Sequence, residues 1–172
     1  GDSKYIDILE RSLYNGALAG ISLGGDRFFY VNPLESKGDH HRQEWYGCAC
    51  CPSQLSRFLP SIGNYIYASS DDALWVNLYI GNTGQIRIGE TDILLTQETD
   101  YPWDGSVKLT ISTSLPLEKE IRLRIPNWCK TYDLSINGKR INVSEEKGYA
   151  VIKDWKSQDV IALDMDMPVE IV

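Results

Sequence analysis

The chain has 172 residues, of which 42% are hydrophobic and 24% charged, so it is long enough to fold around one packed core. Its formal net charge of −7 argues against a nucleic-acid-binding protein, because a phosphate-binding face requires an excess of basic residues. No apolar run approaches the roughly 20 residues needed to span a bilayer, so a membrane is not predicted among the partners either.

The first part of the chain is predicted to form two helices separated by a loop. Residues 2–20 start with the capping residues Asp2 and Ser3, and apolar residues then recur near the helical period. The segment 27–34, "RFFYVNPL", alternates as a strand does. A polar loop follows, and Pro52 predicts the first turn of a helix over residues 52–66, with Pro60 as a kink or an end. No signal peptide is visible, so the compartment stays open between cytoplasm and periplasm.

From about residue 65 the sequence changes to short alternating segments separated by turn signals. "SSDD", "GNTG", "WDGS" and "NGK" supply the Gly, Asn and Asp residues that tight turns favour. About eight short strands without long helices between them predict a mainly β fold, an antiparallel β-sandwich. The predicted strands are 65–69, 73–80, 85–90, 92–101, 106–113, 119–126, 132–138, 149–155 and 159–167.

These patterns predict two domains, residues 1–66 and residues 67–172. One helix, one strand, a thiol cluster and a second helix do not build a closed core in the first segment. We therefore interpret residues 1–66 as the end of a larger helical domain and residues 67–172 as the β-sandwich.

Three of the four cysteines, Cys48, Cys50 and Cys51, fall within four positions. Adjacent cysteines pair only through a strained ring, so free thiols or metal ligands are expected rather than a disulfide. The spacing does not match a zinc ribbon, and a bound zinc would need ligands from elsewhere. The amino-terminal end of a helix stabilises a thiolate, the form that binds metals and attacks substrates. Cys129 is interpreted as a small buried hydrophobe.

Two histidines and three aromatic residues surround the cluster in the sequence. His40 and His41 lie about ten residues upstream, in a segment predicted to be a surface loop; the alternative is that one of them lines the same cleft as the thiols. Tyr30, Trp45 and Tyr46 flank the loop that bears the thiols, although such aromatic residues are more often part of a core.

Five segments in order resemble glycoside hydrolase family 127, the β-L-arabinofuranosidase-like proteins: "YIDILERSLYNGALAGISLGGDRFFYVNPLES", "WYGCACCP", "LRIPNW", "SINGK" and "GYAVIKDWKSQDVIALDMDMPV". The similarity runs over essentially the whole chain. It implies the C-terminal part of such a protein, in which the end of an (α/α)6 barrel precedes a β-sandwich.

The resemblance implies a retaining exo-glycosidase that uses a zinc-held cysteine thiolate on β-L-arabinofuranosides. It assigns Cys50 as nucleophile and zinc ligand and Cys51 as a second zinc ligand. Cys48, Tyr30 and His41 are expected near the substrate. The other two zinc ligands and the general acid/base are expected upstream, in the missing part of the barrel. We therefore expect an incomplete zinc site and no activity in this chain by itself.

Two alternatives remain from the residues themselves. One is a non-catalytic β-sandwich that binds carbohydrate or packs against a partner domain, with structural cysteines. The other is a small metal-binding or redox-sensing module. The implied partner is an arabinofuranoside-containing glycan, and an exposed apolar face on residues 5–18 and 52–65 predicts a homodimer.

Overall fold

The computed structural model describes residues 1–114 and 119–169. The chain divides into two compact units: Gly1–Ile6 with Tyr65–Val172, the sandwich unit, and Asp7–Asn64, the helix–loop unit. Within the described residues, no helix is both long and apolar enough to cross a membrane. The division into domains at residue 66 stays a prediction.

The first helical segment follows the prediction closely but changes its hydrogen-bonding type along its length. Helix α1 (Ser3–Ser12) passes into a π-helical turn, η1 (Leu13–Ala17), and a 3₁₀ turn, η2 (Leu18–Gly20). Asp2 Oδ1 accepts a hydrogen bond from the backbone N–H of Lys4 at 3.1 Å, which satisfies one free donor of the first turn. Tyr5 and Ile8 are each 64% exposed in α1, so the predicted apolar face is partly open to solvent; the homodimer stays a prediction.

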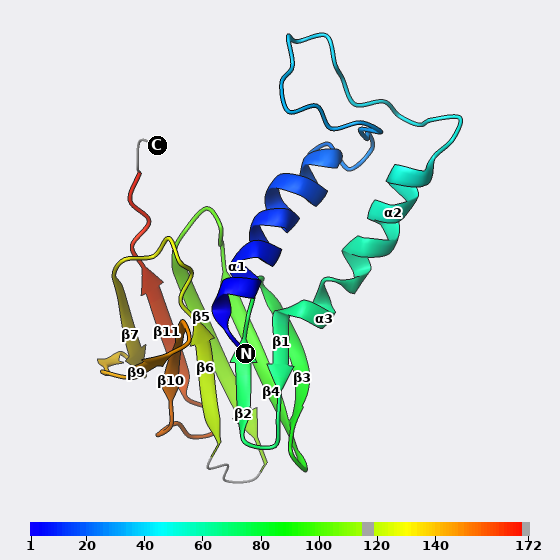
Figure 1. The fold of residues 1–172 in the computed structure, drawn as a ribbon. Helices are drawn as coiled ribbons and strands as arrows, with labels where there is room; N and C mark the ends of the chain where they lie inside the picture. Colours follow the sequence, from blue (N-terminus) through cyan, green and yellow to red (C-terminus); the bar gives the residue numbers. More distant parts are fainter. Residues whose placement is uncertain (115–118, 170–172) are drawn as a thin grey trace. The chain divides into compact units, whose positions relative to one another are not determined.

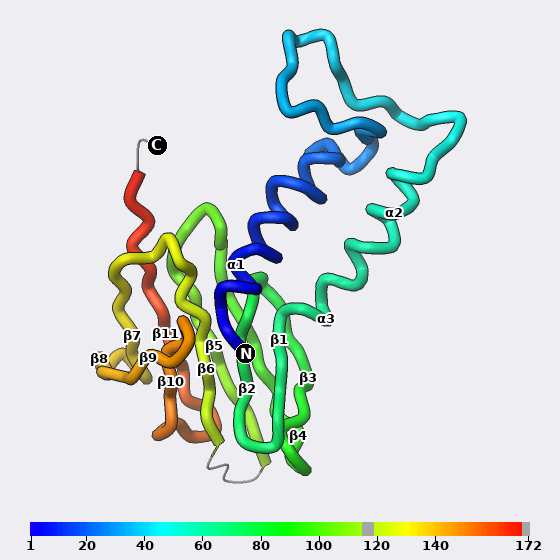
Figure 2. The backbone as a smooth tube through the Cα atoms, viewed as in Figure 1, coloured from blue at the N-terminus to red at the C-terminus, as the bar shows by residue number. Residues whose placement is uncertain are grey.

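The strand predicted over residues 27–34 is wrong. Phe28 forms only isolated bridges, to Ile21 and to Gln43, and the chain then continues as an irregular loop. Figure 2 shows this loop as a long excursion between η2 and the next helix. Pro33 gives a physical reason, since it has no backbone N–H with which to continue a ladder.

The second helical segment begins two residues earlier than Pro52. Helix α2 (Cys50–Phe58) is followed by a 3₁₀ turn, η3 (Leu59–Ser61), and by α3 (Gly63–Ile66). Pro52 lies in the first turn, where its missing N–H leaves no hydrogen bond unmade. The early start places Cys50 and Cys51 inside the first turn rather than before it, and α2 ends before Pro60, as predicted.

The sandwich unit contains two sheets, as the sequence predicts (Figure 1). One sheet has the order β1-β2-β6-β10-β9 and the other β3-β4-β5-β11-β7-β8. The strands are β1 (Tyr67–Ser69), β2 (Ala73–Val76), β3 (Asn82–Ile88), β4 (Thr91–Thr99), β5 (Ser106–Thr113), β6 (Glu120–Arg124), β7 (Tyr132–Ile136), β8 (Lys139–Arg140), β9 (Ser144–Glu146), β10 (Tyr149–Ile152) and β11 (Val160–Met165).

The described strand pairs are antiparallel except one. Strands β2 and β6 run parallel, in a register that pairs Ala73 with Glu120 and Val76 with Leu123. The predicted strand 73–80 is shorter in the structure, because the ladder stops at Val76. The sequence reading missed β8 and β9, which have only two and three residues and are exposed throughout.

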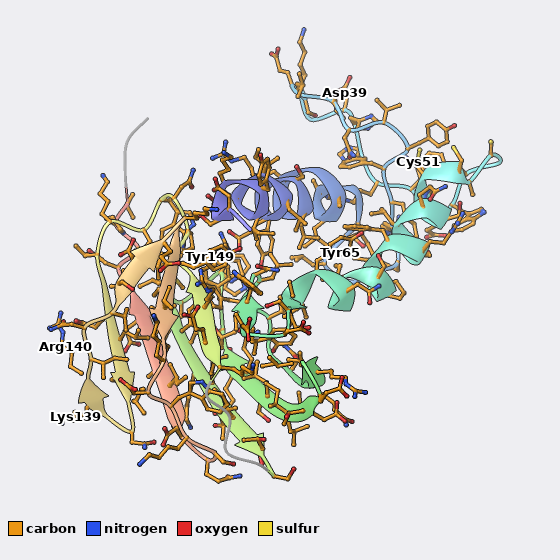
Figure 3. All side chains as sticks on the ribbon, turned by 60° about the horizontal axis from the view of Figure 1, so that its bottom comes forward. Asp39, Cys51, Tyr65, Lys139, Arg140 and Tyr149 are labelled. Atoms are coloured by element: carbon orange, nitrogen blue, oxygen red, sulfur yellow. The ribbon has the colours of Figure 1, made fainter. Side chains whose placement is uncertain are left out.

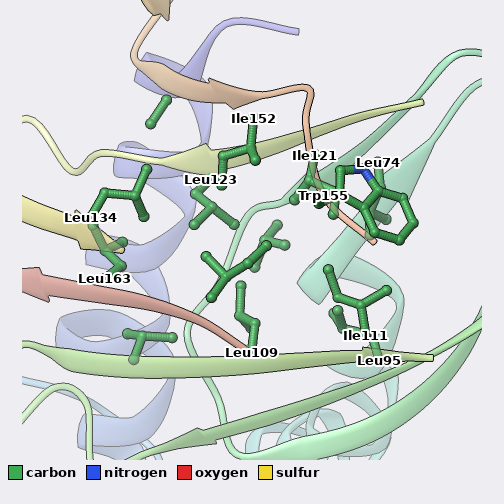
Figure 4. Packing of buried hydrophobic residues seen from close by; sticks show 14 of the residues in the cluster. Leu74, Leu95, Leu109, Ile111, Ile121, Leu123, Leu134, Ile152, Trp155 and Leu163 are labelled. Atoms are coloured by element: carbon green, nitrogen blue, oxygen red, sulfur yellow. The ribbon is translucent and has the colours of Figure 1, made fainter. Parts of the chain in front are cut away.

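The core lies between the two sheets. Leu74, Ile121, Leu123 and Ile152 come from one sheet and meet the side chains of the other, among them Leu109 (Figure 4). The alternation of buried and exposed residues in β4 and β5 is the pattern of strands with one face on a core. Full burial of each such side chain contributes about 1.5–3 kcal/mol relative to exposure, so this core dominates the stability of the unit.

Cys129 is partly buried and packs against that core. Its thiol donates a hydrogen bond to the carbonyl of Thr131 at 3.2 Å, and burial raises the pKa of the thiol. These contacts agree with a small structural residue rather than a reactive one.

Candidate functional site

The thiol cluster lies at the amino-terminal end of α2 in the helix–loop unit, where Figure 3 labels Cys51. All of the cysteines are free. Cys48 and Cys50 are exposed, whereas Cys51 is half-buried. The sulfur atoms of Cys50 and Cys51 are 3.8 Å apart, which is too long for a disulfide and short enough for a weak hydrogen bond.

The long loop brings Tyr30 to the start of α2, where it meets Cys50, a residue twenty positions later in the sequence. Its Oη lies 3.1 Å from Cys50 Sγ. This hydrogen bond lowers the pKa of the Cys50 thiol and raises the pKa of Tyr30 to about 12. The opposite directions mean that the phenol keeps its proton and donates a hydrogen bond to the cysteine sulfur when that sulfur ionises.

The adjacent thiol is affected in the opposite sense. The hydrogen bond with Cys50 raises the pKa of Cys51, and the charges of Cys50 and Cys48 act in the same direction. Cys50 is therefore the member of the pair that ionises first. An exposed thiolate with a hydrogen-bond donor at the start of a helix is the arrangement of a reactive cysteine.

The base of the loop is closed by a pair of backbone hydrogen bonds between Phe28 and Gln43, each 2.8 Å long. An ion pair between Arg27 and Glu44, 2.9 Å long, lies beside it. Just beyond this closure, the Tyr46 hydroxyl hydrogen-bonds the backbone of residues 28 and 30. The sequence identified Tyr46 only as an aromatic neighbour, because nothing in its spacing indicates a partner sixteen residues earlier.

The two histidines differ in their surroundings. His40 stacks on Phe29 with ring centroids 4.8 Å apart, and its Nε2 is 2.8 Å from the carbonyl oxygen of Val31. His41 is exposed, and its carbonyl oxygen accepts a hydrogen bond from the side chain of Gln43. His40 thus supports the loop, while a substrate contact of His41 stays a prediction.

An open pocket of about 370 Å³ borders the two adjacent thiols. It is lined by Ala17, Cys50, Cys51, Gln54, Leu55 and Phe58. Among the described residues, no group of three or more His, Cys, Asp or Glu side chains could hold a metal ion. Two sulfur donors, those of Cys50 and Cys51, lie 3.8 Å apart at this place.

Comparison with protein families decides what the chain is related to. Residues 1–64 match the model of the β-L-arabinofuranosidase, GH127 catalytic domain, and residues 73–167 match that of the GH127 middle domain. The chain belongs to glycoside hydrolase family 127. The family and the mainly β fold class expected from the sequence are both confirmed.

Individual GH127 proteins are similar over nearly all of this chain. A non-reducing end β-L-arabinofuranosidase of Bifidobacterium longum subsp. longum is 38% identical, over 98% of this GH127 chain and 28% of its own length. A GH127 β-arabinofuranosidase structure has 41% identity and a TM-score of 0.91, covering 98% of this chain and 29% of the other. A Geobacillus stearothermophilus T6 GH127 β-L-arabinofuranosidase has 44% identity and a TM-score of 0.89, with the same coverage. The chain thus spans less than a third of the length of these relatives.

Proposed function

We propose that this chain is part of a retaining exo-glycosidase that hydrolyses β-L-arabinofuranosides in glycans, with Cys50 as its nucleophile. The observation that carries the proposal is the exposed Cys50 sulfur in the first turn of α2, 3.1 Å from Tyr30 Oη. The relative in Bifidobacterium longum, a non-reducing end β-L-arabinofuranosidase, supports the choice of sugar.

The chemistry follows from an ionised thiol. The Cys50 sulfur attacks the anomeric carbon, the bond to the leaving oxygen breaks, and that oxygen takes a proton from a carboxylic acid. Water then attacks the same carbon, transfers a proton to the carboxylate and releases the Cys50 thiolate. Two inversions at one carbon retain the configuration. We propose that the carboxylic acid comes from outside these residues.

Zinc is the cofactor we propose for the paired thiols, with Cys50 and Cys51 as two of its ligands. Tetrahedral zinc with Zn–S bonds of about 2.3 Å places two sulfur ligands about 3.8 Å apart, and the two sulfurs are 3.8 Å apart here. Bound zinc would keep its sulfur ligands deprotonated at neutral pH. The remaining ligands are proposed to lie outside this chain, so we expect this chain by itself to bind zinc weakly and to be inactive.

Around the nucleophile, Tyr30, Cys48 and His41 are proposed to lie near the sugar. Tyr30 has direct geometric support, since its hydroxyl already touches Cys50. The exposure of Cys48 and His41 leaves both side chains available to a ligand. The Tyr30 phenol has the clearest role, because it donates a hydrogen bond to the thiolate before attack and becomes free to contact the sugar afterwards.

The test uses the full-length protein and a β-L-arabinofuranoside with a chromogenic leaving group. Cys50→Ser is expected to lower kcat by at least about 10³-fold, because a serine hydroxyl is not ionised at neutral pH. Cys129→Ser is the matched control in the sandwich unit and is expected to keep its turnover. Turnover of Cys50→Ser close to the wild-type rate would overturn the proposal, as would a product of inverted configuration.

A further inference from the structure

We propose that Tyr46 is a positioning residue of this site: its hydroxyl fixes the backbone on both sides of Phe29 and thereby holds the Tyr30 hydroxyl against Cys50. The inference rests on the proposed function, in which Cys50 is the nucleophile. The hydrogen bonds of the Tyr46 hydroxyl go to the backbone and not to a cysteine sulfur. Tyr46 therefore acts on Cys50 through Tyr30.

The hydroxyl of Tyr46 makes two hydrogen bonds to neighbouring parts of one backbone segment. It donates to the carbonyl oxygen of Phe28 at 2.9 Å and accepts the backbone N–H of Tyr30 at 3.1 Å. The two rings also contact, with centroids 5.5 Å apart and planes tilted by 54°. One oxygen atom thus fixes the direction of the chain immediately before and at the residue that carries the phenol.

The position of these two hydrogen bonds along the loop explains why they are needed. The bridge between Phe28 and Gln43 is an isolated one, so the loop leaves regular pairing at Phe28. The Phe29 N–H still donates to the carbonyl oxygen of Gly20 at 2.9 Å. The following donor, the Tyr30 N–H, has the Tyr46 hydroxyl as its partner. Without the Tyr46 oxygen this donor would have to find water, and the backbone that aims Tyr30 would gain freedom.

Phe29, which lies between the two residues that Tyr46 hydrogen-bonds, is held by other contacts. Arg42 lies over the Phe29 ring, with Cζ 4.4 Å from the centroid, and His40 stacks on the same ring. Arg42 in turn donates to the carbonyl oxygen of Ala19 at 2.7 Å. Phe29 is therefore fixed through its ring and through its N–H, which donates to the carbonyl oxygen of Gly20. The backbone N–H of Tyr30 is held by the Tyr46 hydroxyl.

Tyr46 and the Cys50 thiol belong to one short segment of the chain. Tyr46 precedes Cys50 by four residues, and Tyr30 contacts both of them. The covalent segment 46–50 and the hydrogen bonds of Tyr30 with Tyr46 and with Cys50 therefore connect the three residues in a ring. Displacing Tyr30 from Tyr46 consequently changes the distance between Tyr30 Oη and Cys50 Sγ, which is the contact on which the reactive thiol depends.

Tyr46→Phe isolates the hydroxyl from the ring, because phenylalanine keeps the contact with the Tyr30 ring and loses both hydrogen bonds. In the full-length protein we expect Tyr46→Phe to lower kcat for the β-L-arabinofuranoside about fivefold, the value of one net hydrogen bond, with KM changed less than about twofold. Tyr30→Phe is expected to lower kcat as well, and adding Tyr46→Phe to it should cost nothing further. Tyr65→Phe, on α3, is the matched control and keeps wild-type turnover.

Amide hydrogen exchange of the full-length protein gives a readout without turnover. Tyr46→Phe should speed exchange of the Tyr30 amide about fivefold, and Tyr65→Phe should leave it unchanged. An unchanged Tyr30 amide, or equal losses of kcat in the wild-type and Tyr30→Phe backgrounds, would overturn the inference. A wild-type protein without arabinofuranosidase turnover would instead remove the proposed function, while the amide exchange still decides the geometry.

Discussion

The two units of the chain use their hydrophobic residues in different ways. The sandwich unit encloses a continuous core whose central side chains, such as Leu109 and Leu123, are fully buried. Among the described residues of the helix–loop unit, Leu13 is the large apolar side chain that is buried, at 4% exposure. The unit with the core is thus expected to supply stability, and the unit with the exposed thiols carries the proposed chemistry.

The largest expected difference between the units is the loss of unfolding free energy when a leucine is replaced by alanine. Leu109→Ala removes a fully buried side chain from the sandwich core and should destabilise the chain by about 2–5 kcal/mol. Leu55→Ala removes a half-buried side chain that lines the pocket, and should cost less than about 1 kcal/mol. Urea denaturation of the two variants measures both. Equal costs would show that the helix–loop unit has a core of comparable quality.

A glycine pair gives a second contrast. Gly148 has a φ of +76°, and a Cβ there would overlap the Ser3 side chain, so Gly148→Ala should destabilise the sandwich unit by about 1–3 kcal/mol. Gly16, in η1, has open space around its Cβ position, so Gly16→Ala should be neutral or stabilise by up to about 1 kcal/mol. Thermal unfolding of the two variants tests the contrast, and a more stable Gly148→Ala variant would contradict it.

The smallest effect concerns pH. Arg122 donates to Glu120 in β6 and lowers the pKa of that carboxyl, and Lys153 acts in the same direction. Because the folded-state pKa is below the unfolded value of about 4.3, this stabilisation is fully present above that value and is lost as the pH falls through the folded-state pKa. Glu120→Gln should cost up to about 1 kcal/mol at pH 7, and the cost should shrink as the pH falls through the folded-state pKa. A cost independent of pH in urea denaturation would contradict this account.

The sandwich could be predicted from the sequence because its information is local. Alternation in segments such as 106–113 and the turn signals between them place the long strands. Strands β8 and β9 are too short to show alternation, and the parallel pairing of β2 with β6 depends on which edges meet in three dimensions.

The candidate site was only half visible in the sequence. Cys48, Cys50 and Cys51 stand out by their spacing alone, whereas the contact of Tyr30 with Cys50 depends on a twenty-residue return of the loop. Segment 27–34 alternates like a strand, yet Phe28 finds only single partners on each side. The role of Tyr46 arises from two backbone hydrogen bonds, which leave no pattern in side-chain order.

The most direct test of the central claim is to trap the covalent intermediate. The full-length protein is mixed with a β-L-arabinofuranoside, quenched in acid within the turnover time, digested and mapped by peptide mass spectrometry. The account predicts one pentosyl group on the peptide that contains Cys50, located on that sulfur by fragmentation and absent in Cys50→Ser. A pentosyl group on a carboxylate elsewhere, with none on Cys50, would contradict it.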